Sequence, residues 1–198
     1  MSETDTTCTD AKCALRTAMK ALLSKAFPPG ATRLSPPLLR HLRSFLQERE
    51  CSSLTAYLAF QEEPILQPLL QEWLSEGHLL FLPRFCQATA AYELVQATDL
   101  TNNLAPGHYG ILEPLPSLPA EKTLPPTTAW LLPGLAFTRK GIRLGRGKGY
   151  YDRLLAAFPT RAPRIGVCWD CQIVPSLPQN SWDVSLDAIA TPTGVFPV

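Results

Sequence analysis

The stretch of sequence that decides the fold is Leu131–Leu155, which reads LLPGLAFTRKGIRLGRGKGYYDRLL. It begins as a short apolar strand, continues as a loop rich in glycine, lysine and arginine, and ends in a helix expected over Gly149–Phe158. Glycines let the backbone bend and bring its N–H groups close to a ligand. The N-terminus of a helix is the positive end of its dipole. Together these features predict a phosphate-binding site.

The loop matches neither of the common nucleotide motifs. A Walker A loop would need glycine at position 142 and Ser or Thr at position 149, where this chain has Ile142 and Gly149. The glycine spacing is G-x-G-x-G, whereas the dinucleotide motif is G-x-G-x-x-G. The sequence therefore disfavours a P-loop kinase and a Rossmann dehydrogenase. A solvated basic loop with turn glycines remains the structural alternative.

Outward from this stretch, helices alternate with short apolar strands. Helices are expected from Thr9 or Asp10 to Ser24, from Ser35 through Pro36 and Pro37, and over Pro64–Glu76 before Gly77. Strands are expected over Leu54–Phe60, Leu79–Arg84, Tyr92–Ala97, Ala129–Leu132, Ile165–Trp169 and Leu186–Ala190. Residues 101–128 are expected to form a loop. The alternation predicts an α/β fold, with a central mostly parallel or mixed sheet flanked by helices. We expect a single layered domain over residues 1–198, with residues 1–9 as a flexible tail.

Composition narrows the class of protein further. The chain has 198 residues, 45% of them hydrophobic, and a formal net charge of +1. This small charge argues against binding of nucleic acid or anionic membrane through the overall field. No uncharged apolar run approaches the roughly 18 residues of a membrane span. The polar first residues do not resemble a secretory or transit signal, so we expect a cytoplasmic protein.

The six cysteines are expected to be reduced thiols. Cys168 and Cys171 form a C-x-x-C pair, and Cys8 and Cys13 could complete four zinc ligands. The pair follows a strand rather than opening a helix, and the chain has no second C-x-x-C motif. A redox or zinc role is therefore disfavoured.

Two segments carry a resemblance to a known family. PGLAF at Pro133–Phe137 and RLGRGKGYYD at Arg143–Asp152 resemble the signature of the 5-formyltetrahydrofolate cyclo-ligase family. Other parts resemble the family in order and spacing: Lys12 to Arg16, Tyr57–Glu63, GILEP at Gly110–Pro114, Ile165–Val167, and Trp182 to Asp187. The resemblance spans about residues 11–191. It implies a ligase of one-carbon metabolism that uses ATP to close 5-formyltetrahydrofolate to 5,10-methenyltetrahydrofolate, through phosphorylation of the formyl oxygen and release of ADP and phosphate.

The resemblance also implies a role for individual residues. The implied ATP contacts are Lys12, Arg16, Arg143, Leu144, Gly145, Arg146, Gly147, Lys148, Gly149, Tyr150 and Tyr151. The implied substrate contacts are Leu58, Glu63, Arg146, Gly147, Lys148, Gly149 and Tyr150. Arg146 and Lys148 are assigned to the migrating phosphoryl group as catalytic residues. Asp152 and Asp187 are the implied Mg²⁺ ligands, since magnesium takes one or two carboxylates with phosphate oxygens and waters.

The implied partner is a small molecule, 5-formyltetrahydrofolate with or without a polyglutamate tail. We expect a monomer that binds neither nucleic acid nor membrane. One alternative is another ATP-dependent enzyme on the same scaffold, acting on a different amide-like substrate. A second alternative is a non-catalytic module that binds an anion or RNA through Arg139–Arg153.

Overall fold

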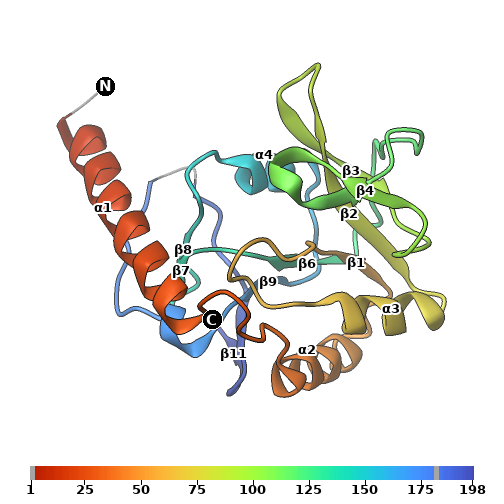
Figure 1. Ribbon diagram of the computed structural model, residues 1–198, viewed down its shortest axis with the longest axis horizontal. Helices are drawn as coiled ribbons and strands as arrows, with labels where there is room; N and C mark the ends of the chain where they lie inside the picture. Colours follow the sequence, from red (N-terminus) through yellow and green to blue (C-terminus); the bar gives the residue numbers. More distant parts are fainter. Residues whose placement is uncertain (1–2, 181–182) are drawn as a thin grey trace.

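A seven-stranded sheet runs through the centre of the molecule (Figure 1). The computed structural model describes residues 3–180 and 183–198. The helices are α1 (Glu3–Ala26), α2 (Pro36–Glu48), α3 (Gln67–Ser75) and α4 (Tyr150–Ala157), with the 3₁₀ turns η1 (His108–Gly110) and η2 (Asp170–Gln172). The strands are β1 (Ser53–Thr55), β2 (Leu79–Cys86), β3 (Ala91–Gln96), β4 (Leu104–Pro106), β5 (Leu112–Pro114), β6 (Thr128–Leu132), β7 (Ala136–Phe137), β8 (Arg143–Leu144), β9 (Arg164–Val167), β10 (Ala188–Thr191) and β11 (Gly194–Pro197).

The strand order of the main sheet is β11-β10-β9-β6-β1-β2-β3. The five inner strands are parallel to their neighbours, whereas β3 and β11 pair antiparallel at the two edges. Two short antiparallel pairs, β4 with β5 and β7 with β8, lie outside this sheet. The predicted α/β fold with a mixed sheet is confirmed.

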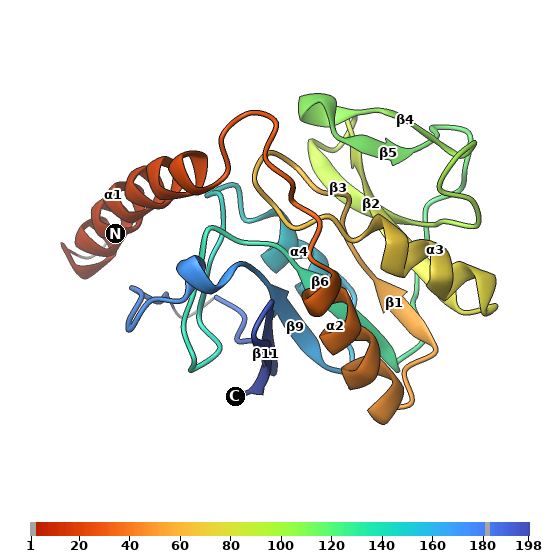
Figure 2. The same cartoon turned by 60° about the horizontal axis from the view of Figure 1, so that its bottom comes forward.

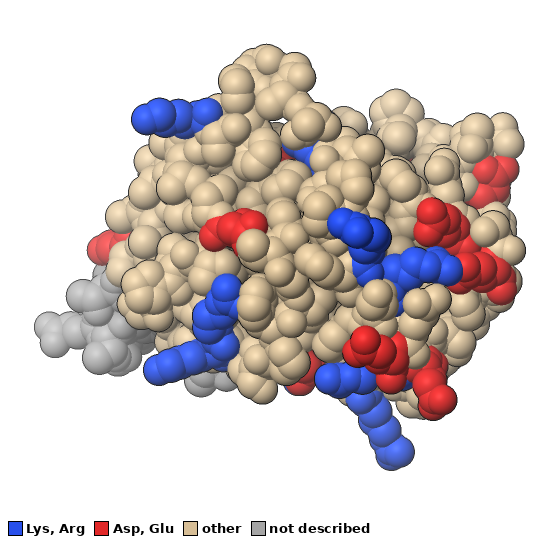
Figure 3. Space-filling view, turned by 90° about the horizontal axis from the view of Figure 1, so that it is seen from below, with Lys and Arg blue, Asp and Glu red and all other residues tan. Residues whose placement is uncertain are grey.

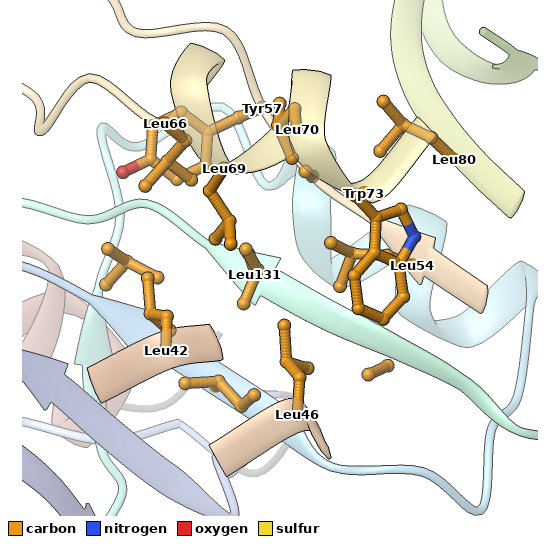
Figure 4. Packing of buried hydrophobic residues seen from close by; sticks show 14 of the residues in the cluster. Leu42, Leu46, Leu54, Tyr57, Leu66, Leu69, Leu70, Trp73, Leu80 and Leu131 are labelled. Carbon is orange, nitrogen blue, oxygen red and sulfur yellow. The ribbon is translucent and has the colours of Figure 1, made fainter. Parts of the chain in front are cut away.

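Side chains on the strands alternate between two apolar layers, as the pleat requires. On β6, Leu131 packs with helices α2 and α3, while Trp130 and Leu132 pack with α4 on the opposite face. The first layer includes Leu42 and Leu46, which point from α2 toward the sheet (Figure 4). Figure 2 shows α2 lying across the strands, with α3 beside it. The sheet is therefore covered on both faces, as inner parallel strands need.

Local signals set two helix ends as predicted. The Ser35 side chain caps α2 by accepting a hydrogen bond from the Leu38 N–H at 3.4 Å, and Pro36 occupies the first turn. After α3, Gly77 takes a left-handed backbone with φ +80, which a residue with a side chain rarely adopts.

The first helix is longer than predicted. Helix α1 begins at Glu3, so Thr9 and Asp10 do not cap it. The flexibility expected of residues 1–9 stays a prediction. Residues 3–8 contain neither proline nor glycine, so nothing in that stretch stops the helix. Residues 1 and 2 lie outside the described part of the chain. The N-terminal half of α1 extends away from the sheet (Figures 1 and 2).

Two other expectations need correction. The strand expected over Leu54–Phe60 ends at Thr55, because the buried residues that follow leave the sheet. Residues 101–128 are not only a loop, since they contain β4, η1 and β5. These elements are three residues each, too short to show a periodic pattern.

Gly166 in β9 supports a testable prediction about the core. A Cβ atom at this position would lie 2.6 Å from Phe137 Cε1 and 2.7 Å from Leu186 Cδ1. We expect Gly166→Ala to lower the free energy of unfolding by about 1–3 kcal/mol, as overpacking does. Urea denaturation would measure the change. The double variant Gly166→Ala, Phe137→Leu should lose less than the sum of the single losses, and simple additivity would contradict the steric explanation.

The surface below the sheet carries charges of both signs. Figure 3 shows basic and acidic groups side by side on this face, with no broad area of one sign. Arg43 of α2, for example, pairs with Glu72 of α3 and with Glu76, which follows that helix. This face therefore offers no extended cationic surface to a polyanion. Within the described residues, no helix combines the length and the apolar character needed to cross a membrane.

Candidate functional site

A cleft of about 960 Å³ opens beyond the carboxyl ends of β1 and β6. Its floor is formed by residues that follow these strands, from Tyr57 to Glu63 and at Pro133 and Gly134. The glycine-rich loop, helices α1 and α4, the turn η1 and strand β5 supply the walls. Ligands of open α/β sheets bind at this edge, because loops from neighbouring strands diverge there.

One end of the cleft is cationic. Its basic lining residues are Lys12, Arg16, Lys20, Arg143, Arg146 and Lys148. Arg153 also lines the cleft and lies over the Tyr150 ring, with 5.1 Å from its Cζ to the centroid. The glycine-rich loop bends through Gly147 at φ +105 and Gly149 at φ +63, and Gly149 is the N-cap of α4. The helix N-terminus, loop amides and cations thus face one space. This arrangement suits an anion such as a phosphate chain.

Two basic side chains of helix α1 bind other parts of the cleft lining. Arg16 Nε donates to the Gly145 carbonyl at 3.0 Å, and Lys12 Nζ donates to Asp183 Oδ2 at 2.5 Å. The side chain of Lys12 is only 9% exposed. The two residues share one helix face, as the four-residue spacing predicted.

Arg143 is held by a carboxylate at the same end. Its Nη2 donates to Asp152 Oδ1 at 2.8 Å, and its Nη1 donates to the Pro133 carbonyl at 3.2 Å. The Arg143 side chain is 5% exposed, and its Nε has no hydrogen-bond partner in the described residues. The ion pair fixes the guanidinium across the loop that opens α4.

Arg146 links the glycine-rich loop to the segment after β1. Its Nε donates to Glu63 Oε1 at 3.3 Å, and its Nη1 donates to Gln61 Oε1 at 2.7 Å. The Phe60 N–H donates to the other Glu63 oxygen at 3.0 Å. Burial raises the pKa of Glu63, and the charge of Arg146 opposes that rise. Both oxygens of Glu63 are therefore engaged.

The opposite end of the cleft is aromatic and apolar. Tyr92 and Tyr150 meet edge to face with 4.9 Å between ring centroids, and Tyr57 and Leu58 are almost fully buried. Tyr109 stands at the mouth with 55% of its surface exposed. Rings in these arrangements form a surface on which a flat, largely apolar group can pack.

The structure brings nearly all the predicted site residues together. Lys12, Arg16, Leu58, Glu63 and the whole run Arg143–Asp152 line this one cleft. Sequence reasoning missed Tyr92, Glu113 and Asp183, which reach the cleft from distant parts of the chain. Two of the three lie in segments that resemble the family: Glu113 is the acidic residue of GILEP, and Asp183 lies in the segment from Trp182 to Asp187.

Asp187 is the exception among the predicted residues. It precedes β10 at the amino end of the parallel strands, outside the cleft lining. Its carboxylate accepts hydrogen bonds from the Arg164 N–H, Nε and Nη2 at 2.8–2.9 Å. Burial opposes ionisation, but the hydrogen bonds and charge of Arg164 prevail and lower the pKa of Asp187. Asp187 therefore does not line the cleft that Asp152 lines, and the magnesium role implied for Asp187 stays a prediction.

The second carboxylate beside the cations is Asp183. It lines the same cleft as Asp152 and pairs with Lys12. Two carboxylates beside a phosphate site match the donor set that magnesium uses, with phosphate oxygens and waters completing the shell. No group of three or more His, Cys, Asp or Glu within residues 3–180 and 183–198 could hold a metal alone. The described residues thus fit a metal that arrives with a phosphate ligand.

The C-x-x-C pair lies away from this chemistry. Cys168 is buried, Cys171 is exposed, and both are free thiols. Burial raises the pKa of both thiols, which disfavours the reactive thiolate. His108 stacks on Phe85 with 3.9 Å between ring centroids and does not line the cleft.

The comparisons with known proteins agree on one family. The model of the 5-formyltetrahydrofolate cyclo-ligase family matches residues 8–192. A probable 5-formyltetrahydrofolate cyclo-ligase of Caenorhabditis elegans is 30% identical over 189 residues, 91% of this chain and 92% of that protein. The 5-formyltetrahydrofolate cyclo-ligase of Mycolicibacterium smegmatis is 33% identical over 186 residues, 91% of this chain and 93% of that protein.

A solved structure extends the likeness to three dimensions. The NMR structure of Aquifex aeolicus 5,10-methenyltetrahydrofolate synthetase superposes with a TM-score of 0.76 at 28% identity, covering 94% of this chain and 92% of that one. Fold and cleft define an α/β protein in which cations and aromatic rings line one cleft. The chain is an enzyme of the 5-formyltetrahydrofolate cyclo-ligase family.

Proposed function

We propose that this chain closes 5-formyltetrahydrofolate to 5,10-methenyltetrahydrofolate with ATP, and that ADP and phosphate are released. The observation that carries the proposal is that both cations and aromatic rings line one cleft. A triphosphate matches the cations and a reduced pteridine matches the rings. A reaction between the two needs both ligands in one space, which this cleft offers.

The cationic end would bind the phosphates of ATP. Lys12 and Arg16 from α1 and Lys148 from the loop supply charge-assisted donors, and the loop amides around Gly147 supply neutral donors. In this arrangement Lys12 exchanges part of its contact with Asp183 for the nucleotide. The ligand then neutralises cations that otherwise repel one another across the loop.

The proposed chemistry activates an unreactive formyl carbon. The formyl oxygen attacks the γ-phosphorus of ATP, and the bond from that phosphorus to the ADP oxygen breaks. The neighbouring aniline nitrogen then attacks the carbon of the phosphorylated imidate and loses its proton. Departure of phosphate with the C–O electron pair leaves the conjugated five-membered ring. The protein contributes positioning and charge neutralisation, which dominate phosphoryl transfer.

We assign to Arg146 and Lys148 the role of stabilising the phosphoryl group while it is transferred. Arg146 already spans the two halves of the site, through Glu63 on one side and the glycine-rich loop on the other. Its guanidinium also lies over the Phe60 ring at 4.8 Å from the centroid. A cation held at this boundary stabilises negative charge that develops as the phosphoryl group moves between ligands.

Asp152 and Asp183 are the residues that would hold magnesium. When bound, the ion neutralises charge on the phosphate oxygens. Asp152 also keeps Arg143 in place, and Asp183 also pairs with Lys12. Each proposed metal ligand therefore also contacts a basic side chain of the cleft, Arg143 for Asp152 and Lys12 for Asp183.

A near-ultraviolet absorbance trace tests the proposal. Purified protein is mixed with 5-formyltetrahydrofolate, Mg²⁺ and ATP, and each component is left out in turn. The methenyl absorption band should grow only when all are present. A flat trace from protein whose melting temperature still rises with MgATP would favour another amide-like substrate on the same scaffold. A flat trace without that rise, together with salt-dependent RNA binding, would favour a non-catalytic module.

Gly147 offers a second prediction, about the nucleotide end. An alanine there would be strained at φ +105, and its Cβ would lie 3.3 Å from Arg16 Cζ. We expect Gly147→Ala to weaken MgATP binding about tenfold, because a shift of a loop amide loses roughly one hydrogen bond to a charged group. The MgATP-induced rise in melting temperature would measure it.

Gly77→Ala is the matched control for backbone strain. Gly77 also has positive φ, at +80, but no atom lies within 4 Å of the added Cβ and the residue is outside the cleft. This variant should lose stability yet keep the full response to MgATP. An unchanged MgATP response in Gly147→Ala would contradict the placement of the phosphates on this loop.

A further inference from the structure

Glu113 is a buried carboxylate at the aromatic end of the cleft with one oxygen unused. It lies in β5, is 5% exposed, and belongs to the cleft lining. Its Oε2 accepts a hydrogen bond from the Phe85 N–H at 3.0 Å. Its Oε1 has no partner within the described residues. A buried acceptor without a hydrogen-bond partner destabilises the protein. A ligand that donates a hydrogen bond to this oxygen removes that penalty and therefore binds more tightly.

The turn before Glu113 is shaped to admit this side chain. A Cβ atom at Gly107 would lie only 2.3 Å from Glu113 Oε2 and 2.4 Å from its carboxyl carbon. The chain then turns through Tyr109 at φ +60, a left-handed conformation uncommon for a residue with a side chain. Pairing of Ala105 with Glu113 closes the β4–β5 ribbon across this turn. The conformation of this turn therefore fixes the position of the Glu113 carboxylate.

The surroundings of Glu113 suit a flat ring rather than a phosphate. Tyr92 and Ile111 line the cleft beside it, and Tyr150 lies against Tyr92. Burial, then the negative charge of Glu113 and the contact of the phenol with that side chain, raise the pKa of Tyr92, so its phenol stays protonated beside the carboxylate. A second anion would be repelled here, whereas a neutral N–H donor would be attracted.

Glu63 does not have this free capacity. Arg146 occupies one of its oxygens and the Phe60 N–H occupies the other. These two glutamates of the cleft thus differ. Both oxygens of Glu63 are engaged, whereas Glu113 has an oxygen that can still accept a hydrogen bond.

We propose that Glu113 Oε1 accepts a hydrogen bond from an N–H donor of the substrate's pyrimidine-type ring and so selects ring systems that present such a donor. The inference rests on the proposed function and identifies Glu113 as the residue that recognises the ring. A site built around a hydrogen-bond partner rejects analogues that lack it, because the buried group is then left unpaired. Glu113 is a specificity residue in this account, and the phosphate chemistry takes place elsewhere in the cleft.

Glu113→Gln tests the inference with little change in shape. A glutamine can keep its one oxygen on the Phe85 N–H, which leaves its NH₂ group facing the ligand donor. We expect the Kd and the KM for 5-formyltetrahydrofolate to rise about 10- to 100-fold, the range for loss of a hydrogen bond to a charged group. The KM for ATP and the melting temperature of the free protein should stay close to those of the wild type. Fluorescence titration and steady-state kinetics measure these quantities.

Two further variants make the test specific. Glu93→Gln is the matched control, since Glu93 pairs with Arg84 and does not line the cleft; its folate affinity should be unchanged. Gly107→Ala keeps the carboxylate but displaces it, and should weaken folate binding without weakening ATP binding.

The possible outcomes separate this inference from the proposed function. Wild-type protein that binds and cyclises the folate, with Glu113→Gln and Gly107→Ala both equal to it, would overturn this inference alone. Wild-type protein that binds no folate would overturn the proposed function and this inference with it. Equal losses for folate and ATP would show that Glu113 only maintains the fold, which also overturns the inference.

Discussion

Arg146→Ala should lower kcat by about 10²–10³-fold, the range seen when a preorganised charge-stabilising donor is removed. The reason is the position of the Arg146 guanidinium between the two halves of the cleft, where it donates hydrogen bonds to Glu63 and Gln61. The Kd for the folate should change far less, because the ring rests on the aromatic end. Steady-state kinetics with a separate folate titration would measure both quantities.

The same variant should change the pH dependence of stability. Burial already raises the pKa of Glu63, and Arg146 is the charge that restrains the rise. Without it the pKa in the folded state rises further. A raised pKa contributes stability that is fully present below the unfolded value, near 4.5, and is lost as the pH passes the folded value. Arg146→Ala should therefore lose more stability than the wild type as the pH rises above about 4.5.

Arg139→Ala is the control for both effects. Arg139 belongs to the same basic segment but stacks on the Phe196 ring, with 3.4 Å from its Cζ to the centroid, and does not line the cleft. Its turnover should equal that of the wild type. Equal losses of kcat and folate affinity in Arg146→Ala would instead identify Arg146 as a general binding residue.

The sequence predicts the parts of this molecule that depend on local chemistry. Ser35 caps a helix and Gly77 ends one because capping and left-handed backbone are properties of a few adjacent residues. The cationic end of the cleft was predictable for a similar reason. Its glycines and cations are contiguous in the loop before α4, and the family resemblance added Lys12 and Arg16.

The parts that were missed depend on tertiary placement. The sequence predicts one strand over Leu54–Phe60, and only the path of the chain shows that Tyr57 leaves the sheet to line the cleft. Glu113 lies in a three-residue strand whose partner is equally short, so periodicity carries no signal. The difference between Asp183 and Asp187 has the same origin. The two aspartates are four residues apart, but Asp183 lines the cleft, whereas Asp187 immediately precedes β10 and lies outside the cleft lining.

That difference leads to the second large expected effect. Asp183→Asn should raise the Mg²⁺ concentration needed for half-maximal turnover by about 10- to 100-fold, because one of two carboxylates beside the phosphate site is neutralised. It also removes the carboxylate partner of Lys12, with which Asp183 shares a contact of 2.5 Å. The KM for ATP should rise as well when Mg²⁺ is limiting. A magnesium titration of the cyclisation rate measures the first effect directly.

Asp187→Asn is the matched variant, with the same chemical change four residues along the chain. It should leave the Mg²⁺ dependence unchanged and instead weaken the ion pair with Arg164. The lowered pKa of Asp187 contributes stability above the unfolded value, near 3.8, and that stability is lost as the pH falls through the folded value. The variant should therefore be less stable than the wild type at neutral pH, and the two should converge in acid. If Asp187→Asn, and not Asp183→Asn, raised the Mg²⁺ requirement, the metal would have to bind outside the cleft that holds the phosphates. The glycine-rich loop, α1 and α4 would then not form one nucleotide site.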